Sequence, residues 1–173
     1  MKDATFMIPT PNLLQKVVDM LSDIDMKGSD TKGDLYEYLL SKLSTAGKNG
    51  QFRTPRHIIE MMVELTDPKP EDKVCDPSCG TAGFLVATSE YLREKHPEVL
   101  HDEKLREHFN SSMFYGMDFD ATMIRISAMD LLLHGIESPN LQRVDSLSEQ
   151  SLETRYKNVL RDQYSLILAN PPF

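Results

Sequence analysis

The sequence has no tryptophan, only two cysteines among 173 residues, and no long apolar run. No stretch approaches the roughly 20 apolar residues that a membrane-spanning helix needs, so no passage through a membrane is predicted. The N-terminal stretch MKDATFMIPT lacks the apolar core of a secretory signal, and a cytoplasmic protein is therefore expected.

Basic residues are also scarce: 19 Lys and Arg stand against 27 Asp and Glu, for a net charge of −8. Neutralisation of phosphates by Lys and Arg supplies most non-specific affinity for nucleic acids. The chain is therefore not expected to bind a nucleic acid tightly by itself. Any such role must use basic surface from another chain. The remaining composition, 40% hydrophobic and 27% charged, is that of an ordinary globular protein with a core.

The two cysteines, Cys75 and Cys79, stand on either side of Asp76. A zinc site would need two further ligands at matching spacing, and the sequence offers no such pair of His or Cys residues. We predict a reduced pair, one cysteine at a strand end and one in a loop, and no metal.

The N-terminal third is predicted to be helical. Apolar residues recur at three- and four-residue steps from Asn12 to Asp25, and Asp34 is placed to cap a second helix. Residues 44–55 have the composition of a loop, and Pro55 suits the first turn of a third helix. The predicted organisation is a helical segment, residues 1–48, followed by a domain spanning residues 49–173.

From Pro68 onward, predicted strands alternate with helices. The strands are expected before the glycine-rich turn at residues 76–83, at 113–118, at 141–147 and at 164–170, with helices at 82–94, within 93–108, and at 121–136. This alternation predicts an α/β fold with a doubly wound parallel sheet. Right-handed crossovers place the carboxyl ends of such strands along one edge, where ligands bind. That edge would collect Asp76 to Gly83, Asp118, Asp145 and Asn170.

The turn DPSCGTAGF would let a ligand approach the backbone, because Gly80 and Gly83 carry no Cβ. The helix that follows offers free N–H groups. No Lys stands in a GK[ST] setting, which disfavours a nucleoside triphosphate. Asp76 places an anion beside the ligand, which suits a cation.

Two acidic residues end later strands. Asp118 could accept both hydroxyls of a ribose, or it could cap the next helix. Asp120 is the better candidate for that cap, which leaves Asp118 for a ligand. Asp145 could bond an adenine amino group, but by itself its position is mostly that of an ordinary turn residue.

The C-terminal NPPF begins directly after an apolar strand. Two prolines fix the backbone, so the Asn170 side-chain oxygen and the Pro171 carbonyl could form a converging pair of acceptors. Such a pair suits a planar amino group that must become nucleophilic, and Phe173 could stack on the ring that carries it. The alternative is a turn that merely ends the strand, but the other three strand ends argue for a site.

These residues resemble an S-adenosylmethionine-dependent amino-methyltransferase. The similarity is to the modification subunit of type I restriction–modification systems, which methylates adenine N6 in DNA. It covers residues 34–173 through six blocks in family order: DLYEYLLSKL, GQFRTPRHIIEMMV, DPSCGTAGFL, YGMDFD, IRISAMDLLLHGI and LILANPPF. The resemblance implies an incomplete sheet of the SAM-dependent methyltransferase type, preceded by a short helical segment.

The resemblance also implies roles for individual residues. Gln51, Phe52, Arg53, Thr54, Pro55 and Arg56 would contact the methionine end of S-adenosylmethionine, with Arg53 departing from the aromatic residue usual in the family. Asp76, Gly80, Thr81, Ala82 and Gly83 would line its methionine and ribose, Asp118 would bind the ribose hydroxyls, and Asp145 would bind the adenine edge. Asn170, Pro171, Pro172 and Phe173 would hold a target adenine that has been flipped out of double-stranded DNA. No covalent enzyme intermediate is implied, because the methyl group transfers directly.

The family implies further partners: a DNA-recognition (specificity) subunit, which determines the target sequence, and a restriction subunit. Family members extend past NPPF and begin with a longer helical domain, so the chain is expected to be a fragment with weak or no methylation by itself. Alternatives are a truncated subunit that only binds partner chains and a methyltransferase acting on protein glutamine or RNA. A NAD-dependent dehydrogenase is disfavoured, since G-x-G-x-x-G is absent and Asp118 lies 38 positions past Gly80 (118 − 80) instead of about 20.

Overall fold

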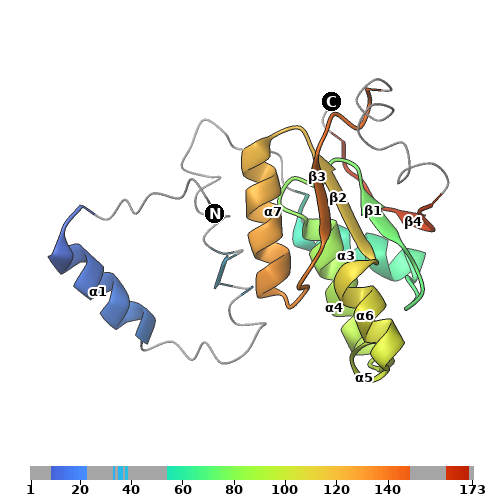
Figure 1. Ribbon diagram of the computed structural model, residues 1–173, viewed down its shortest axis with the longest axis horizontal. Coiled ribbons are helices and arrows are strands. Elements are labelled where there is room, and N and C mark those ends of the chain that lie inside the picture. The colour runs from blue at the N-terminus through green and yellow to red at the C-terminus, as the bar shows by residue number, and fades with distance from the viewer. Residues whose placement is uncertain are drawn as a thin grey trace.

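The computed structural model describes residues 9–22, 33, 35, 36, 38, 54–148 and 163–171. Its centre is a four-stranded sheet in which all neighbouring strands are parallel (Figure 1). The strands are β1 (Val74–Asp76), β2 (Phe114–Asp118), β3 (Asn140–Arg143) and β4 (Leu166–Ile167). The predicted α/β fold with a parallel sheet is confirmed, although β3 and β4 are shorter than the apolar patterns suggested.

The strand order, β3-β2-β1-β4, explains where a ligand can bind. The chain passes from β1 to β2 to β3 in one direction across the sheet, and β4 then lies on the other side of β1. This reversal creates a topological switch point between β1 and β4. In open α/β sheets, ligands bind outside the carboxyl ends of the strands at such a point.

The helices lie close to their predicted positions. They are α1 (Pro11–Ser22), α3 (Arg56–Thr66), α4 (Gly83–Lys95), α5 (Glu98–His101), α6 (Glu103–Ser111) and α7 (Ala121–Leu133). The charged stretch predicted as one surface helix forms two, because the side chain of Asp102 accepts the N–H groups of Lys104 and Leu105 and starts α6. Gly135, with φ +78°, follows the end of α7 as expected for a C-terminal glycine.

Side chains alternate between the two faces of the sheet and divide the core into two parts. Val74, Phe114 and Leu168 point to one face, where they form the main core with apolar residues of α3, α4, α6 and α7. Cys75, Met117 and Val144 belong to a smaller cluster that also includes Tyr115 and Tyr164. The helices thus cover one face and fix the direction in which each strand end points.

The N-terminal part is described only in pieces. Thr10 accepts the N–H of Leu13 at the start of α1, which stands apart from the sheet in Figure 1. Leu35 and Tyr36 are helical, in agreement with the second predicted helix, while Asp34, its predicted cap, lies outside the described residues. Gly33 lies against the buried ring of His134, where an added Cβ would come within 2.3 Å of Nε2.

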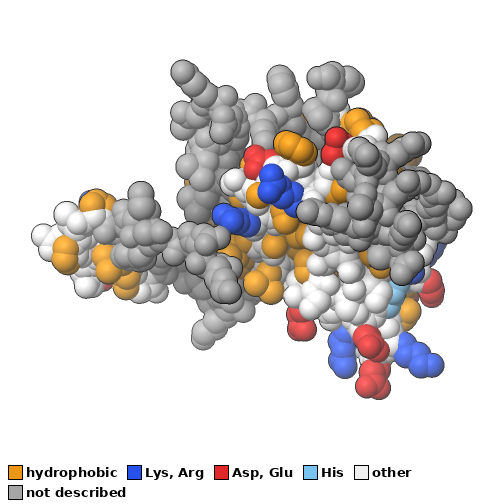
Figure 2. Space-filling model, turned by 45° about the horizontal axis from the view of Figure 1, so that its top comes forward, with side chains coloured by type: hydrophobic (Ala, Val, Ile, Leu, Met, Phe, Trp, Pro, Cys, Tyr) orange, Lys and Arg blue, Asp and Glu red, His pale blue; other side chains and the backbone are white. Residues whose placement is uncertain are grey.

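The surface carries charges of both signs. Figure 2 shows acidic, basic and hydrophobic side chains close together over the described part of one face. Several charges are paired, for example Arg56 with Glu60 and Glu90 at 2.9 Å each. No helix in the described segments is long and apolar enough to cross a bilayer.

Candidate active site at the carboxyl edge of the sheet

The glycine-rich turn after β1 is fastened to the end of β2. The Cys79 N–H donates to the Met117 carbonyl at 2.9 Å, and the Gly80 N–H donates to Asp118 Oδ2 at 3.1 Å. Gly116 permits this approach, because an added Cβ would lie 2.6 Å from Leu141 Cδ2 and 3.1 Å from Cys79 Sγ. Two of the predicted site segments are therefore in direct contact.

The turn has open space beside Gly80. Gly80 has φ +52°, and an added Cβ there would meet no atom within 4 Å. Ala82 also has a positive φ, +69°, a conformation that costs an L-residue about 1–2 kcal/mol. Helix α4 then begins at Gly83, where no side chain among the described residues caps it. Thr81, which stands between Gly80 and Ala82, is half-buried. The open space at Gly80 and the uncapped start of α4 fit the cofactor-binding role predicted for this turn.

Asp118 is held by two backbone groups. Its Oδ1 accepts the Asp120 N–H at 2.7 Å, and its Oδ2 accepts the Gly80 N–H. Asp120 caps α7 by accepting the Thr122 N–H at 2.7 Å, which confirms the predicted cap. Because each carboxylate oxygen has two acceptor sites, Asp118 retains capacity for two ligand hydroxyls.

Asp76 is the most deeply buried acid at this edge, with 2% of its surface exposed. Burial raises its pKa to about 7, and the neighbouring negative charge of Asp118 adds to the increase. Its Oδ1 accepts the Ser78 N–H at 3.0 Å. The carboxyl group is thus about half ionised at neutral pH, and a bound cation would favour the ionised form.

The thiols of the two cysteines on either side of Asp76 have low reactivity. Burial raises the pKa values of Cys75 and Cys79 to about 12, so both thiols are neutral near pH 7 and poor nucleophiles. The described residues contain no group of three or more His, Cys, Asp or Glu able to hold a metal ion.

Asn170 follows β4, which pairs with β1 on the side opposite to β2. The Leu168 N–H donates to the Cys75 carbonyl at 3.0 Å, which brings the end of the chain to the carboxyl end of β1. The Asn170 Nδ2 then donates to Thr54 Oγ1 at 2.9 Å. Two predicted site blocks that are 116 residues apart therefore meet. Pro171 is exposed beside them, whereas Gln51, Phe52, Arg53, Pro172 and Phe173 lie outside the described residues.

Other predicted site residues have different partners in this structure. The Arg56 guanidinium bonds Glu60 and Glu90, on α3 and α4. The Pro55 carbonyl accepts the N–H groups of Ile58 and Ile59 in the first turn of α3. Asp145 follows Val144, whose N–H donates to the Asp118 carbonyl, and its own carboxylate accepts the Leu147 N–H at 3.0 Å. The cofactor contacts predicted for these three residues remain predictions.

Phe119 is a residue that the sequence analysis did not single out. It directly follows Asp118, and 73% of its surface is exposed. Its carbonyl accepts the Arg143 Nε–H at 3.1 Å, which ties the loop after β2 to the end of β3. An exposed ring beside a strand-end acid can stack on a purine. The signal was in the sequence, as an aromatic residue adjoining that acid.

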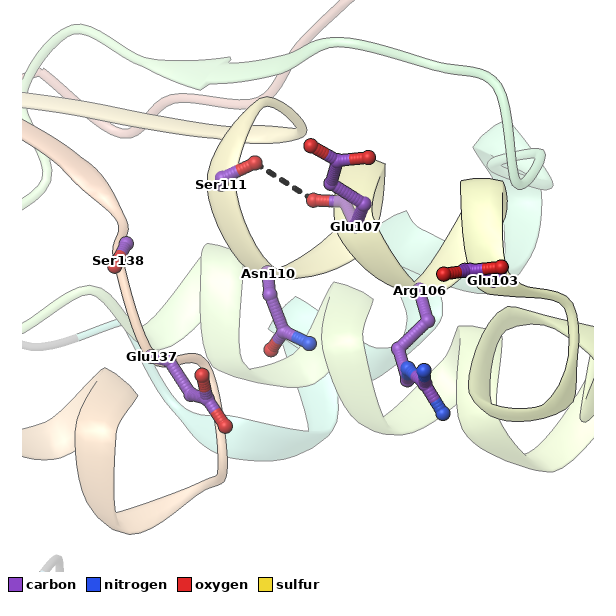
Figure 3. A pocket seen from close by; sticks show the side chains of 7 residues that line it. All are labelled: Glu103, Arg106, Glu107, Asn110, Ser111, Glu137 and Ser138. Carbon is purple, nitrogen blue, oxygen red and sulfur yellow. Dashed lines mark hydrogen bonds between the residues drawn. The ribbon is translucent and has the colours of Figure 1, made fainter.

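A pocket of about 390 Å³ lies at the opposite edge of the sheet (Figure 3). It is formed by α6 and by the loop before β3, with side chains from Glu103, Arg106, Glu107, Asn110, Ser111, Glu137 and Ser138. Three of these residues are acidic, and the pocket opens near the amino ends of β2 and β3. Ligands of doubly wound sheets bind at the other end of the strands, so this pocket is a poor candidate for the active site.

The fold is similar to that of a solved structure. A putative class I S-adenosylmethionine-dependent methyltransferase from Listeria monocytogenes matches 91% of this chain and 44% of its own, with a TM-score of 0.61 and 18% identity, a likeness of fold alone. The chain belongs to the N-6 DNA methylase family, whose family model matches residues 27–173.

Two relatives make the similarity more specific. The type I restriction enzyme EcoEI methylase subunit of Escherichia coli is 32% identical over 99% of this chain and 34% of its own length. The crystal structure of a modification subunit of a putative type I restriction enzyme from Vibrio vulnificus YJ016 is 36% identical, with a TM-score of 0.73, over 93% of this chain and 32% of that one. The expected resemblance to type I modification subunits is confirmed. The chain spans about one third of the length of these relatives.

Proposed function

We propose that this chain carries the methyl-donor site and the amine-positioning motif of a DNA methyltransferase. S-adenosylmethionine would bind at the switch point, and the target would be N6 of an adenine flipped out of the duplex. The chain would act in the cytoplasm as part of a modification subunit, together with DNA-recognition and restriction subunits. Membership of the N-6 DNA methylase family and similarity to type I methylase subunits support this proposal.

One observation carries the proposal: the two blocks assigned to cofactor and target meet at one edge of the sheet, through Asn170 and Thr54. The glycine-rich turn and Asp118 lie at the same edge, on the other side of the switch point. A methyl donor bound across the turn would therefore face a base held at Asn170.

The chemistry asked of these residues is positioning and charge stabilisation. When bound, S-adenosylmethionine supplies an electrophilic methyl group. Asn170 Oδ1 would accept a hydrogen bond from the N6–H of adenine. This bond would direct the N6 lone pair toward the methyl carbon. The N6–carbon bond forms as the carbon–sulfur bond breaks, and one N6 proton is released to solvent. No protein nucleophile takes part, which suits the neutral thiols of Cys75 and Cys79.

Cofactor binding is tested by calorimetry with S-adenosylmethionine and S-adenosylhomocysteine. Asp118→Ala removes both the proposed acceptor for the ribose and the carboxylate that anchors Gly80, and we expect affinity to fall at least about tenfold, or 1.4 kcal/mol. Asp102→Ala is the matched control, because Asp102 caps α6 away from the proposed site. Equal affinities for wild type and Asp118→Ala would contradict the proposal.

The substrate is tested with labelled cofactor and a choice of acceptors. Adenine-containing duplex DNA, a glutamine-bearing protein and RNA are offered to the chain assembled with its partner subunits. We expect label in DNA alone. Label in protein or RNA would favour the alternative amino-methyltransferase, and cofactor binding without any transfer would favour a subunit that only binds partners.

A further inference from the structure

A hydrogen bond joins the Asn170 amide to the hydroxyl of Thr54. An amide has an NH₂ group with two donors on one side and a carbonyl oxygen acceptor on the other. Because Nδ2 donates to Thr54 Oγ1 at 2.9 Å, Oδ1 points away from Thr54. Asn170 is exposed, so burial does not hold its side chain in this orientation.

Thr54 is itself well fixed. It precedes Pro55, which restricts its backbone, and its branched Cβ limits its side-chain rotamers. The Pro55 carbonyl accepts the N–H groups of Ile58 and Ile59 at 2.9 and 3.2 Å and so begins α3. Ile59 is buried in the main core, within reach of Gly83 at the start of α4. Thr54 therefore stands directly before a helix that is anchored in the core.

We propose that Thr54 is a positioning residue for methyl transfer, whose hydroxyl holds the Asn170 side chain in place and leaves Oδ1 as the acceptor for the target amine. This inference rests on the proposed function. It differs from the role predicted for Thr54 from the sequence, a contact with the methionine end of the cofactor. The two roles separate in experiment, because a cofactor contact governs cofactor affinity and a positioning contact governs the rate of transfer.

The contact is tested first by NMR on the chain without ligand. The side-chain NH₂ resonances of Asn170 are assigned by their loss in Asn170→Asp. Thr54→Val keeps the shape of the side chain and removes the hydroxyl, and we expect these resonances to move toward those of a solvent-exposed amide. Thr54→Ser retains the hydroxyl and should restore them. Thr66→Val is the matched control, because the Thr66 hydroxyl bonds within α3, to Met62. Unchanged Asn170 resonances in Thr54→Val would overturn the proposal.

The consequence is tested by kinetics on the methyltransferase assembled with its partner subunits on duplex DNA. We expect Thr54→Val to lower the transfer rate about tenfold or more, because small misplacements of reacting groups cost up to about 10²-fold. The cofactor dissociation constant should stay within about twofold, and Thr54→Ser should recover most of the rate. A weakened cofactor affinity with an unchanged rate would assign Thr54 to the cofactor instead. If the wild-type assembly transfers no methyl group, the proposed function fails and Thr54 remains only a structural contact.

Discussion

Asp76 shows how the site changes the chemistry of a single residue. In a short strand between two neighbours, its carboxyl group is removed from water, and this burial raises its pKa to about 7. An acid that is ionised throughout the neutral range in solution here changes charge within it. Since a sulfonium is a cation, its binding would favour the ionised carboxylate and release protons near pH 7.

The same shift makes stability depend on pH. In the unfolded chain the group has a pKa near 3.8, so between about pH 4 and pH 7 the folded state holds a proton that the unfolded state has lost. The stabilisation from protonated Asp76 is therefore complete below about pH 4 and is lost as pH rises through about 7. Asp76→Asn should be more stable than wild type at pH 8 by about 2–4 kcal/mol and nearly equal to it at pH 4.

Urea unfolding of wild type and Asp76→Asn across this pH range measures the difference. Asp102→Asn serves as a control for the loss of one negative charge, because Asn caps a helix about as well as Asp. Parallel stability curves for wild type and Asp76→Asn would show that Asp76 titrates as an ordinary exposed acid.

At the scale of elements, the joint between β2 and the glycine-rich turn positions the site. Gly116 leaves room for the side chains of Cys79 and Leu141, both of which an added Cβ would approach. The turn needs this room to place the Gly80 N–H on Asp118. The proposed cofactor site therefore depends on the close approach of the glycine-rich turn to β2.

Gly116→Ala tests this joint. The new methyl group would sit 2.6 Å from Leu141 Cδ2 and 3.1 Å from Cys79 Sγ, so the Leu141 side chain must shift and Cys79 in the turn must give way slightly. We expect cofactor affinity to fall about tenfold and stability to fall by about 1–3 kcal/mol. Calorimetry and thermal unfolding provide the two readouts. Leu141→Ala in the same chain should recover part of the stability. If Gly116→Ala bound the cofactor as tightly as wild type, the contact between β2 and the turn would not position the cofactor site.

At the scale of the whole molecule, charge limits what the chain can do alone. The net charge is −8, and both signs are mixed over the face shown in Figure 2. Phosphate contacts from clustered Lys and Arg are the usual source of DNA affinity. In the proposed function, a flipped adenine would therefore reach Asn170 with another subunit holding the duplex in place.

We therefore expect the purified chain to bind duplex DNA with a dissociation constant above about 10⁻⁴ M at physiological salt. Methyl transfer from labelled cofactor should be weak or absent with the chain alone and should rise when DNA-recognition partners are added. Partner subunits without this chain give the background. Robust methylation of duplex DNA by the isolated chain would contradict the proposal.

The sequence predicted the elements well because their signals are local. Asp120 caps the helix that begins one residue later, and Pro55 indicated the helix that begins at Arg56. The alternation of strands and helices was enough to predict a parallel sheet and to place Asp118 and Asn170 at one edge. These features depend on the spacing of residue types along the chain, which can be read directly from the sequence.

The tertiary structure alone decided what surrounds each of these residues. The pKa of Asp76 depends on burial by neighbouring strands, and Arg56 bonds Glu90 on another helix. The contact from Asn170 to Thr54 joins residues 116 positions apart. Partners and burial of this kind follow from how helices and strands pack, and no short sequence pattern specifies them. The amino-acid sequence thus determined which groups stand at the strand ends, and packing determined their charge and orientation.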